Sequence, residues 1–549
     1  MLINTQELYE QELAPFLQSS NTPIAVDTET NITDRYQDRF LLGISLAKDD
    51  RIFYIPIGHD SWMDTDGLNL PVPKELYRGV QAELVFFNAK FDLHVLKKAG
   101  IIIPDLKIYD VMLMCHLIDE NEFQYSLDMM GLKYLNVRKE RDLAKEMKKD
   151  WLSIPAPIMA KYAEQDARMT LELYNHLKEQ FTPYEEVWNI DEKFLLLLQQ
   201  MEQKGIPVNV EVAKELQLRC EKRLQEIENE LGIDIAKPSQ LHRKLFDAPP
   251  IGFGIKVTQR TPNGKPQVNT RFLETCNHPA AGLILEWREI QKQLTSYYNP
   301  YITKAEGYGR IHADFQQHGT VTGRLSCKNP NLQQIPRDAP VKKLFLAESG
   351  KQLWEIDFRT IEMRLAMVYA DETKMLEIFK VDGDVHQATA DDLKVTRQQA
   401  KVINFLIIYG GGANALSAQL NLSLTESKKI LDRYRAAYPK LFRKMNEATA
   451  AGEQFGEVKL WSGRKRHFKW PSEAHKGFNS IIQGGAFEIV KRSMLRLREA
   501  GFDIRSQVHD SVWIMVNNEA EVKEAEKIMS DWTEELFGLK FSVESKRLN

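Results

Sequence analysis

The pattern of hydrophobic and polar positions divides the chain into segments of different character. From about residue 20 to 180, short apolar runs alternate with amphipathic stretches of helical period, which predicts an α/β domain. The expected strands are 24–26, 44–46, 52–57 and 84–87, and the expected helices are 109–118 and 160–177. Neither a repeat nor a low-complexity tract interrupts the pattern.

Beyond this domain the pattern predicts helices first and a mixed region afterwards. In order, the expected segments are long charged helices (185–232) interrupted at Gly205, a loop or hairpin (250–270), renewed strands from 311, a helix-rich block (371–450) and a hairpin (504–516). A strand that ends at Asp357 precedes the helix-rich block. We therefore expect one sheet that is interrupted by a helical insertion.

Length and composition exclude several classes of protein. A chain of 549 residues predicts about three to five domains, and 43% hydrophobic with 27% charged residues is ordinary for a globular protein. The net charge of -4 gives no global sign of nucleic-acid binding, although a local basic groove is compatible with that sum. With no signal peptide and no membrane-length apolar run, we expect a soluble intracellular protein.

Cysteines and a basic run add little chemistry of their own. The four cysteines include no C-x-x-C pair, so neither a disulfide framework nor structural zinc is expected. A basic run with aromatic residues is, taken alone, typical of a solvated loop, and we expect that here. The run comprises Lys459, Arg464, Lys465, Arg466, Lys469 and Lys476, interleaved with Trp461, Phe468 and Trp470.

Four carboxylates and a phenol follow the strands and helices of the α/β domain. Asp27 and Glu29 come directly after the first expected strand and share one face of it. Asp92 lies one turn into a helix after the fourth strand, and Tyr162 and Asp166 share a helical face. Carboxylate oxygens suit Mg²⁺ or Mn²⁺, so the set indicates metal-assisted phosphodiester hydrolysis.

A second pair of carboxylates, Asp357 and Asp510, follows two distant strand-like runs. Paired aspartates at strand ends can hold two divalent cations. Between them, residues at steps of four drift by only about 40° around a helix and form a stripe of two cations and two rings. The stripe consists of Arg397, Lys401, Phe405 and Tyr409. Alone it is typical of a basic amphipathic helix, but beside the aspartates it indicates nucleotidyl transfer from a triphosphate.

The N-terminal motifs resemble the three exonuclease motifs of the proofreading 3′–5′ exonucleases, over roughly residues 20–180. The resemblance implies a ribonuclease H-like α/β domain over residues 1–182. It also implies that Asp27, Glu29 and Asp166 hold one cation and that Asp92 holds a second. Tyr162 would orient the attacking water.

Residues 311–516 resemble the family A (DNA polymerase I-like) DNA polymerases. The segments that carry the resemblance are 357–362 (motif A), 397–410 (motif B), 509–510 (motif C), 384–389 (start of the fingers), 320–326 and 330–336 (primer–template grip) and 479–484 (minor-groove helix). The implied fold is an α+β right hand. Its expected parts are a thumb and connecting region (183–310), a palm (311–370 and 471–549) and fingers (371–470).

The resemblance assigns roles to the motif residues. Asp357 and Asp510 would bind two Mg²⁺ ions, with Mn²⁺ as a substitute, and Lys401 would also protonate the departing pyrophosphate. The residues that would hold the triphosphate are Arg397, Lys401 and His386. Tyr409 would guard the template side of the new base pair, and Glu362 would exclude a ribose 2′-hydroxyl.

The resemblance also implies how the chain treats dideoxynucleotide chain terminators and which residues contact DNA. Phe405 lacks the phenol that helps some relatives accept dideoxynucleotides, so we expect discrimination against them. The residues that would contact the minor groove and the primer terminus are Arg324, Asn479, Gln483 and His509. The expected partners are primer–template DNA and deoxynucleoside triphosphates, with replication accessory proteins optional and no membrane.

Three positions depart from the motifs. Ser511 replaces the glutamate that usually follows the motif C aspartate, which puts metal affinity in question. Arg359 and Thr360 replace the small and amide residues common in motif A. Among the 549 residues no 5′-nuclease domain precedes the exonuclease motifs, so nick translation by this chain is not expected.

The resulting prediction is a monomeric DNA polymerase with 3′–5′ proofreading, acting in replication or repair. Its expected setting is the cytoplasm of a bacterium or of a virus-infected cell, with an organelle left open. Two alternatives remain: a single-subunit RNA polymerase-like enzyme, and a DNA-binding exonuclease with a degenerate polymerase domain.

Overall fold

The structure is a computed structural model that describes residues 1–19, 21–31, 41–59, 69–139, 151–336 and 340–549. The chain separates into two compact units, each built from several stretches of sequence. The first contains Met1–Lys204, Phe315–Ser326 and Glu355–Lys546, and the second contains Gly205–Asp314, Cys327–Trp354 and Arg547–Asn549. No helix among the described residues is long and apolar enough to cross a bilayer.

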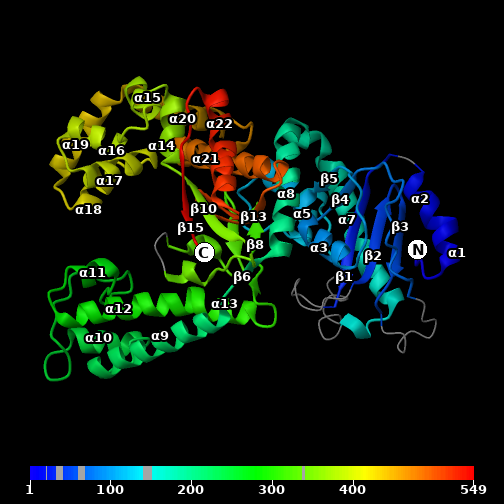
Figure 1. Cartoon of the computed structure of the whole chain (residues 1–549), viewed down its shortest axis with the longest axis horizontal. Coiled ribbons are helices and arrows are strands. Elements are labelled where there is room, and N and C mark those ends of the chain that lie inside the picture. Colours follow the sequence, from blue (N-terminus) through cyan, green and yellow to red (C-terminus); the bar gives the residue numbers. More distant parts are fainter. Residues whose placement is uncertain (20, 32–40, 60–68, 140–150, 337–339) are drawn as a thin grey trace. The chain divides into compact units, whose positions relative to one another are not determined.

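The N-terminal part of the first unit is built on a five-stranded sheet in the order β3-β2-β1-β4-β5 (Figure 1). Its strands are β1 (Ile24–Thr30), β2 (Leu41–Lys48), β3 (Arg51–Pro56), β4 (Leu84–Phe86) and β5 (Ile108–Asp110). β1 runs antiparallel to β2 and parallel to β4, and β4 runs parallel to β5. All four predicted strands are therefore confirmed, and β1 and β2 extend beyond the predicted residues.

Helices pack their apolar faces against this sheet, most of them in one large core. They are α1 (Gln6–Leu8), η1 (Tyr9–Leu13), α2 (Ala14–Gln18), α3 (Ala89–Lys98), α4 (Val111–Ile118), α5 (Leu127–Leu135), η2 (Trp151–Ser153), α7 (Ala156–Phe181), η3 (Thr182–Tyr184) and α8 (Glu185–Lys204). η2 and the start of α7 contribute to a smaller cluster with Leu42 and Tyr54. The predicted helix 160–177 is confirmed within α7. The helix predicted over 109–118 starts two residues late, because Asp110 ends β5 and its carboxylate caps the backbone N–H of Met112 at 3.0 Å.

The C-terminal sheet of four strands has the order β13-β14-β10-β15. Its strands are β10 (Gln352–Phe358), β13 (Asp503–Val508), β14 (Ser511–Val516) and β15 (Val543–Arg547). The accompanying helices are α14 (Ile361–Ala370), η7 (Pro471–Lys476), α21 (Gly477–Glu499) and α22 (Glu519–Phe537). The prediction of one sheet interrupted by helices is confirmed, since the long insertion lies between β10 and β13.

The insertion is almost entirely helical. Its elements are α15 (Thr373–Lys380), α16 (Val385–Leu393), α17 (Arg397–Ile408), α18 (Ala413–Leu420), α19 (Leu424–Ala437), α20 (Pro439–Phe455), β11 (Glu457–Lys459) and β12 (Lys465–His467). α17 begins at Arg397 because Thr396 and Gln399 form a capping box there. Its buried face carries Ile403 and Ile407, and the opposite face exposes Arg397 and Lys401 of the predicted stripe and leaves Phe405 half-buried.

The second unit contains long helices around a separate apolar core. Its elements are β6 (Ile206–Pro207), α9 (Val210–Leu231), α10 (Pro238–Phe246), α11 (Thr270–Glu274), α12 (Pro279–Gln293), η4 (Leu294–Tyr298), α13 (Asn299–Ala305), β7 (Arg310–Ile311), η5 (Leu332–Gln334) and η6 (Pro340–Leu344), while β8 (Asp314–Gln316) and β9 (Ser326–Lys328) pair with each other. The predicted break in the charged helices occurs at Gly205, whose φ of +60° favours glycine. The predicted loop over 250–270 is also confirmed, with one isolated bridge between Arg260 and Pro266.

Buried ion pairs tie distant segments of the first unit together. Arg464 donates to Asp191 and, at 3.1 Å, to Glu488, while Lys491 donates to both carboxylates at 2.6 Å. All four side chains are at most 8% exposed. The prediction that the basic run is a solvated loop is therefore wrong for Arg464, which complements carboxylates contributed by α8 and α21.

Arg466 shows the same departure from a solvated loop. Its guanidinium donates to Glu120 at 2.7 Å, and the neighbouring His467 contacts the other oxygen of that carboxylate at 2.9 Å. Arg466 and Glu120 are buried. Burial raises the energetic cost of each charge alone, so these side chains stay inside only as pairs.

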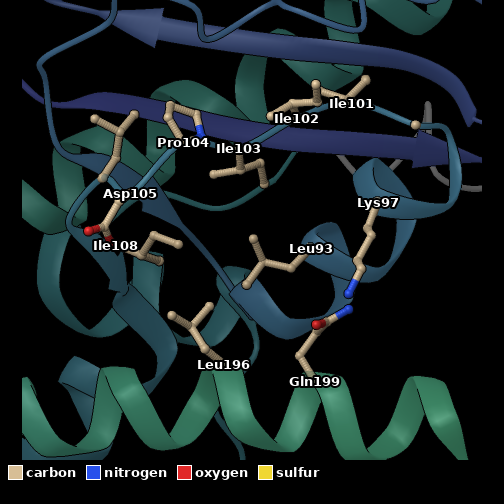
Figure 2. A pocket seen from close by; sticks show the side chains of 12 residues that line it. Leu93, Lys97, Ile101, Ile102, Ile103, Pro104, Asp105, Ile108, Leu196 and Gln199 are labelled. Carbon is tan, nitrogen blue, oxygen red and sulfur yellow. The ribbon is translucent and has the colours of Figure 1, made fainter. Parts of the chain in front are cut away.

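A pocket of about 600 Å³ lies between α3, residues 100–106 and α8 (Figure 2). Aliphatic side chains such as Leu93, Ile103 and Leu196 form most of its wall. Asp105 is the one carboxylate among its described lining residues. The pocket therefore lacks the paired carboxylates of a divalent metal site.

Candidate active sites

The first candidate site lies on β1. Asp27 and Glu29 project from the same face of this strand, and α7 brings Asp166 beside them. One carboxylate oxygen from each of the three lies within 4.8 Å of the others. Three clustered carboxylates are a donor set that fits Mg²⁺ or Mn²⁺.

Asp92 reaches the same strand from α3. Its Oδ1 accepts the backbone N–H of Thr28 at 3.0 Å and the Thr28 hydroxyl at 2.7 Å. Thr28 stands between Asp27 and Glu29, so the fourth carboxylate is fixed against the first two. Asp92 is only 2% exposed. The structure thus brings together all four carboxylates that the sequence predicts for this site.

Asp110 is a site residue that sequence reasoning missed. Its carboxylate accepts the backbone N–H groups of Asn88 at 3.0 Å and Ala89 at 2.9 Å, which start the helix that carries Asp92. Asn88 adopts a left-handed conformation with φ of +69°. Asp110 therefore fixes the turn that aims Asp92. An aspartate between a strand and a helix is a capping signal that could have revealed it.

Lys139 is a second missed residue. Its ammonium donates to the Tyr162 hydroxyl at 2.9 Å and also to Asp166. It lies 4.6 Å from the centre of the Tyr162 ring. Lys139 therefore fixes the predicted phenol and adds a positive charge to the carboxylate cluster. No spacing rule pairs it with residues more than 20 positions away.

Burial dominates the electrostatics of the cluster. It raises the pKa of Asp27 to about 7, with the charge of Asp166 adding to the rise and Lys139 opposing it. The pKa values of Glu29 and Asp92 are raised well above their ordinary range, by burial and then by the charge of Asp27. Without a cation, the cluster therefore holds protons near neutral pH.

These raised pKa values predict that Mg²⁺ stabilises the protein more as pH rises. Between about pH 4 and about pH 7 the folded chain holds protons that the unfolded chain has released, so the free energy of unfolding falls as pH rises. A bound cation offsets the same charges. Thermal unfolding in EDTA and in Mg²⁺ should show a larger increment in Tm at about pH 8 than at about pH 6. Asp27→Asn should flatten this trend, and an unchanged increment in wild type would contradict it.

The second candidate site lies at the ends of β10 and the β13–β14 hairpin. Asp357 is the penultimate residue of β10, and Asp510 occupies the hairpin turn with His509, whose φ is +55°. The backbone N–H of Phe358 donates to the Asp510 carbonyl at 3.3 Å. The two predicted carboxylates therefore stand on neighbouring segments, 153 positions apart in the sequence.

Glu362 connects this pair to the helical insertion. Arg324 donates to Glu362 Oε1 at 2.8 Å and to Asp510 Oδ1 at 3.3 Å, and the Tyr409 hydroxyl donates to Glu362 Oε2. Glu362 is 3% exposed, and burial raises its pKa while Arg324 opposes the rise. Four predicted site residues thus form one hydrogen-bonded group.

The predicted stripe follows one exposed edge of α17. Arg397 and Lys401 are exposed, and Arg397 donates to Asp384 at 2.6 Å. The Phe405 ring lies 5.8 Å from that of His386 and 6.2 Å from that of Tyr409. Two cations therefore precede two aromatic rings along the helix, an arrangement that suits a nucleoside triphosphate.

The protonation state of His386 is set by its neighbours. Asn404 uses its Oδ1 to accept from Tyr434 at 2.9 Å, so its amide nitrogen donates to His386 Nδ1 at 3.0 Å. The neutral ring then carries its proton on Nε2, which is buried without a partner among the described residues. Burial, Lys401 and Arg397 lower the pKa of His386. Asn404, which sequence reasoning missed, orients this donor.

The predicted DNA-contacting residues lie on α21, in the loop that carries Arg324 and, for His509, in the β13–β14 hairpin turn. Asn479 and Gln483 lie one turn apart on α21 and are half-buried. Close packing at Gly484 brings this helix to the loop, since a Cβ there would lie 2.5 Å from the Thr322 carbonyl. The Oδ1 atom of Asn479 is buried without a partner among the described residues.

Comparison with known proteins matches both halves of the chain. Residues 208–546 match DNA polymerase family A, and residues 3–182 match 3′-5′ exonuclease. DNA polymerase I of Treponema pallidum (strain Nichols) is 28% identical over 480 residues, which cover 80% of this chain and 48% of that protein. DNA polymerase I of Pseudomonas aeruginosa is 28% identical over 556 residues, which cover 90% and 60%. The chain thus spans about half to three fifths of the length of these relatives.

One solved structure covers almost the whole chain. The POL domain of Pol1 from M. smegmatis, in complex with DNA primer-template and dNTP, aligns with a TM-score of 0.81 and 21% sequence identity. The match covers 98% of this chain and 97% of that one. The predicted fold, an α/β exonuclease domain joined to a right-hand polymerase domain, is confirmed.

Proposed function

Because the chain belongs to DNA polymerase family A, we propose that it is a template-directed DNA polymerase with 3′–5′ proofreading. It extends a primer 3′-hydroxyl with deoxynucleoside triphosphates and removes mispaired ends by hydrolysis. The observation that carries this proposal is the presence of two separate carboxylate groups in one chain. One of them is linked through Arg324 and Glu362 to Tyr409, at the end of a cationic and aromatic helix edge.

Divalent cations fit both centres, and both families generally use them. We assign two Mg²⁺ ions to each, held by Asp357 and Asp510 at one centre and by the four N-terminal carboxylates at the other. Bound there, such ions supply a Lewis acid for attack at phosphorus and for the leaving oxygen. Mn²⁺, which has similar ligand preferences, should replace Mg²⁺.

At the polymerase centre the chain's own side chains bind and orient the nucleotide. Arg397, Lys401 and the Nε2–H of His386 provide donors for the triphosphate, and Lys401 can give a proton to the departing pyrophosphate. Tyr409 lies at the template side of the new pair. Arg324 donates to both Asp510 and Glu362, so it couples DNA contact to the metal centre.

The remaining assignments concern DNA and the exonuclease reaction. Asn479, Gln483 and His509 contact the minor groove and the primer terminus, where base acceptors allow pair shape to be checked without reading sequence. Tyr162, held by Lys139, orients the water that cleaves the terminal phosphodiester. We divide the chain into an exonuclease domain (1–182), a thumb and connecting region (183–310), a palm (311–370 and 471–549) and fingers (371–470).

The two alternatives receive less support. A single-subunit RNA polymerase-like enzyme must admit a ribose 2′-hydroxyl, whereas Glu362 is held rigidly by Arg324 and Tyr409. A degenerate polymerase domain would lose its charged groups, yet Asp357, Asp510, Arg397 and Lys401 are all retained. The proposed monomer acts on primer–template DNA, with accessory proteins as optional partners.

Replacing Glu362 should relax sugar selection. Glu362→Ala opens the space that a 2′-hydroxyl needs, and the ratio of ribonucleotide to deoxynucleotide incorporation should rise by roughly tenfold to hundredfold. Glu362→Gln keeps the size of the side chain, so it should retain the wild-type ratio. Single-nucleotide extension kinetics with each substrate measure this ratio. Equal ratios in the alanine variant and wild type would remove Glu362 as the gate.

Replacing Phe405 should change terminator use. Phe405→Tyr adds a phenol beside the sugar, where one hydrogen bond can compensate for the missing 3′-hydroxyl of a dideoxynucleotide. One such bond corresponds to roughly tenfold in relative incorporation. Competition between dideoxy- and deoxynucleotides in primer extension measures the ratio. Comparable use of both substrates by the wild-type chain would contradict the assignment.

A primer with a labelled 5′ end, annealed to a longer template, tests the proposed function. With Mg²⁺ and deoxynucleotides the wild-type chain should lengthen the primer, and with Mg²⁺ alone it should shorten it. Shortening under both conditions would favour the degenerate polymerase. Ribonucleotide extension at a similar rate would favour the RNA polymerase.

A further inference from the structure

The buried carboxylate of Glu355 lies two residues before Asp357 on β10. Alternate side chains of a strand share a face, and each residue adds about 3.3 Å, so the two Cβ atoms are about 7 Å apart. Glu355 is 9% exposed. It therefore presents a third negative charge on the face of β10 that carries Asp357.

Two donors from the neighbouring strand β14 hold this carboxylate. Ser511 Oγ lies 2.9 Å from Glu355 Oε1, and Trp513 Nε1 donates to the same oxygen at 3.3 Å. The single hydroxyl proton of Ser511 also reaches the Val508 carbonyl at 2.8 Å. Both of these donors are neutral, and together they orient the carboxylate.

Ser511 directly follows Asp510, at the position where the chain departs from the motif C pattern. A serine there cannot supply a carboxylate, but its hydroxyl contacts one that arrives from the adjacent strand. We propose that Glu355 is the third carboxylate of the polymerase metal centre, and that Ser511 and Trp513 position it. This inference rests on the proposed function.

The distance from Asp357 determines how Glu355 acts. At about 7 Å between Cβ atoms, its carboxylate reaches the water shell of a cation held by Asp357 and Asp510, so Glu355 is a positioning residue. Changes to such outer partners typically reduce metal affinity by about tenfold to hundredfold.

Mn²⁺ binding to the full chain tests the inference separately from catalysis. The parent protein carries Asp27→Ala, which stops excision, and is bound to primer–template DNA with a dideoxy-terminated primer and the matching nucleotide. Electron paramagnetic resonance then measures free Mn²⁺ during titration. Glu355→Gln keeps an acceptor oxygen for Ser511 and Trp513 and removes only the charge. It should weaken Mn²⁺ binding by about tenfold or more and raise the Mg²⁺ requirement of extension similarly.

A second substitution restores a carboxylate to the site, this time from strand β14 rather than from β10. Adding Ser511→Glu to Glu355→Gln should recover at least part of the lost Mn²⁺ affinity. Unchanged affinity in Glu355→Gln would overturn the inference, as would equal loss in the double variant. If the chain with native Glu355 does not extend primers, the proposed polymerase function is wrong. That result is distinct from unchanged Mn²⁺ affinity in Glu355→Gln, which refutes only the role of Glu355.

Discussion

Asp357→Ala abolishes primer extension and leaves primer shortening intact, if the two centres act as assigned. Asp357 is one of only two carboxylates assigned as ligands of the polymerase cations, so its loss removes charge stabilisation at the reacting phosphate. We expect extension to fall roughly a thousandfold or more, which corresponds to about 4 kcal/mol. The labelled-primer assay with and without deoxynucleotides measures both activities in one sample.

Asp27→Ala provides the reciprocal control. It removes one of the three clustered carboxylates on the exonuclease side and should abolish shortening while extension continues. The activity that each variant retains therefore shows that this variant is folded. Normal extension by Asp357→Ala would remove Asp357 from the polymerase centre, and loss of both activities in either variant would contradict their independence.

Asp191→Ala should produce the largest loss of stability. It leaves Arg464 and Lys491 buried, with Glu488 as the remaining carboxylate of the group. Removing one partner from a buried ion pair costs about 3–5 kcal/mol, because the other charge stays uncompensated. Thermal unfolding and limited proteolysis of the whole chain measure the loss. Since a chain of this size does not unfold in one step, the transition that shifts identifies the affected part.

An exposed ion pair supplies the matched control. Asp371 contacts Lys440 at 2.8 Å, and its side chain is 79% exposed. Solvent screens such a pair, and asparagine tolerates the left-handed backbone conformation of Asp371 (φ +50°), so Asp371→Asn should leave the unfolding midpoint unchanged. If Asp191→Ala also leaves the unfolding midpoint unchanged, the buried ion pairs of Arg464 and Lys491 do not stabilise the packing of the segments that they connect.

The sequence revealed those parts of the sites whose signal is local. Asp27 and Glu29 follow an apolar strand at a spacing of two, and Tyr162 and Asp166 share a helical face at a spacing of four. The strands and the break at Gly205 were also predictable, because turn and strand preferences depend on nearby residues. These patterns need no knowledge of what the chain contacts elsewhere.

The sequence did not reveal partners that are distant along the chain. Lys139 reaches Asp166, Ser511 reaches Glu355 across 156 positions, and Arg464 reaches Asp191 across 273. Arg464 was therefore expected in a solvated loop. The prediction that a helix begins at Tyr109 was wrong for a different reason. Apolar residues flank Asp110 on both sides, and this pattern hides the aspartate that caps the helix.

The most direct test of the central claim is the position of bound metal. Crystals of the chain with primer–template DNA, nucleotide and Mn²⁺ yield anomalous scattering peaks that locate the cations. We expect peaks beside Asp357 and Asp510 and further peaks among Asp27, Glu29 and Asp166. Mn²⁺ bound elsewhere, with neither carboxylate centre occupied, would show that these carboxylates are not the metal ligands.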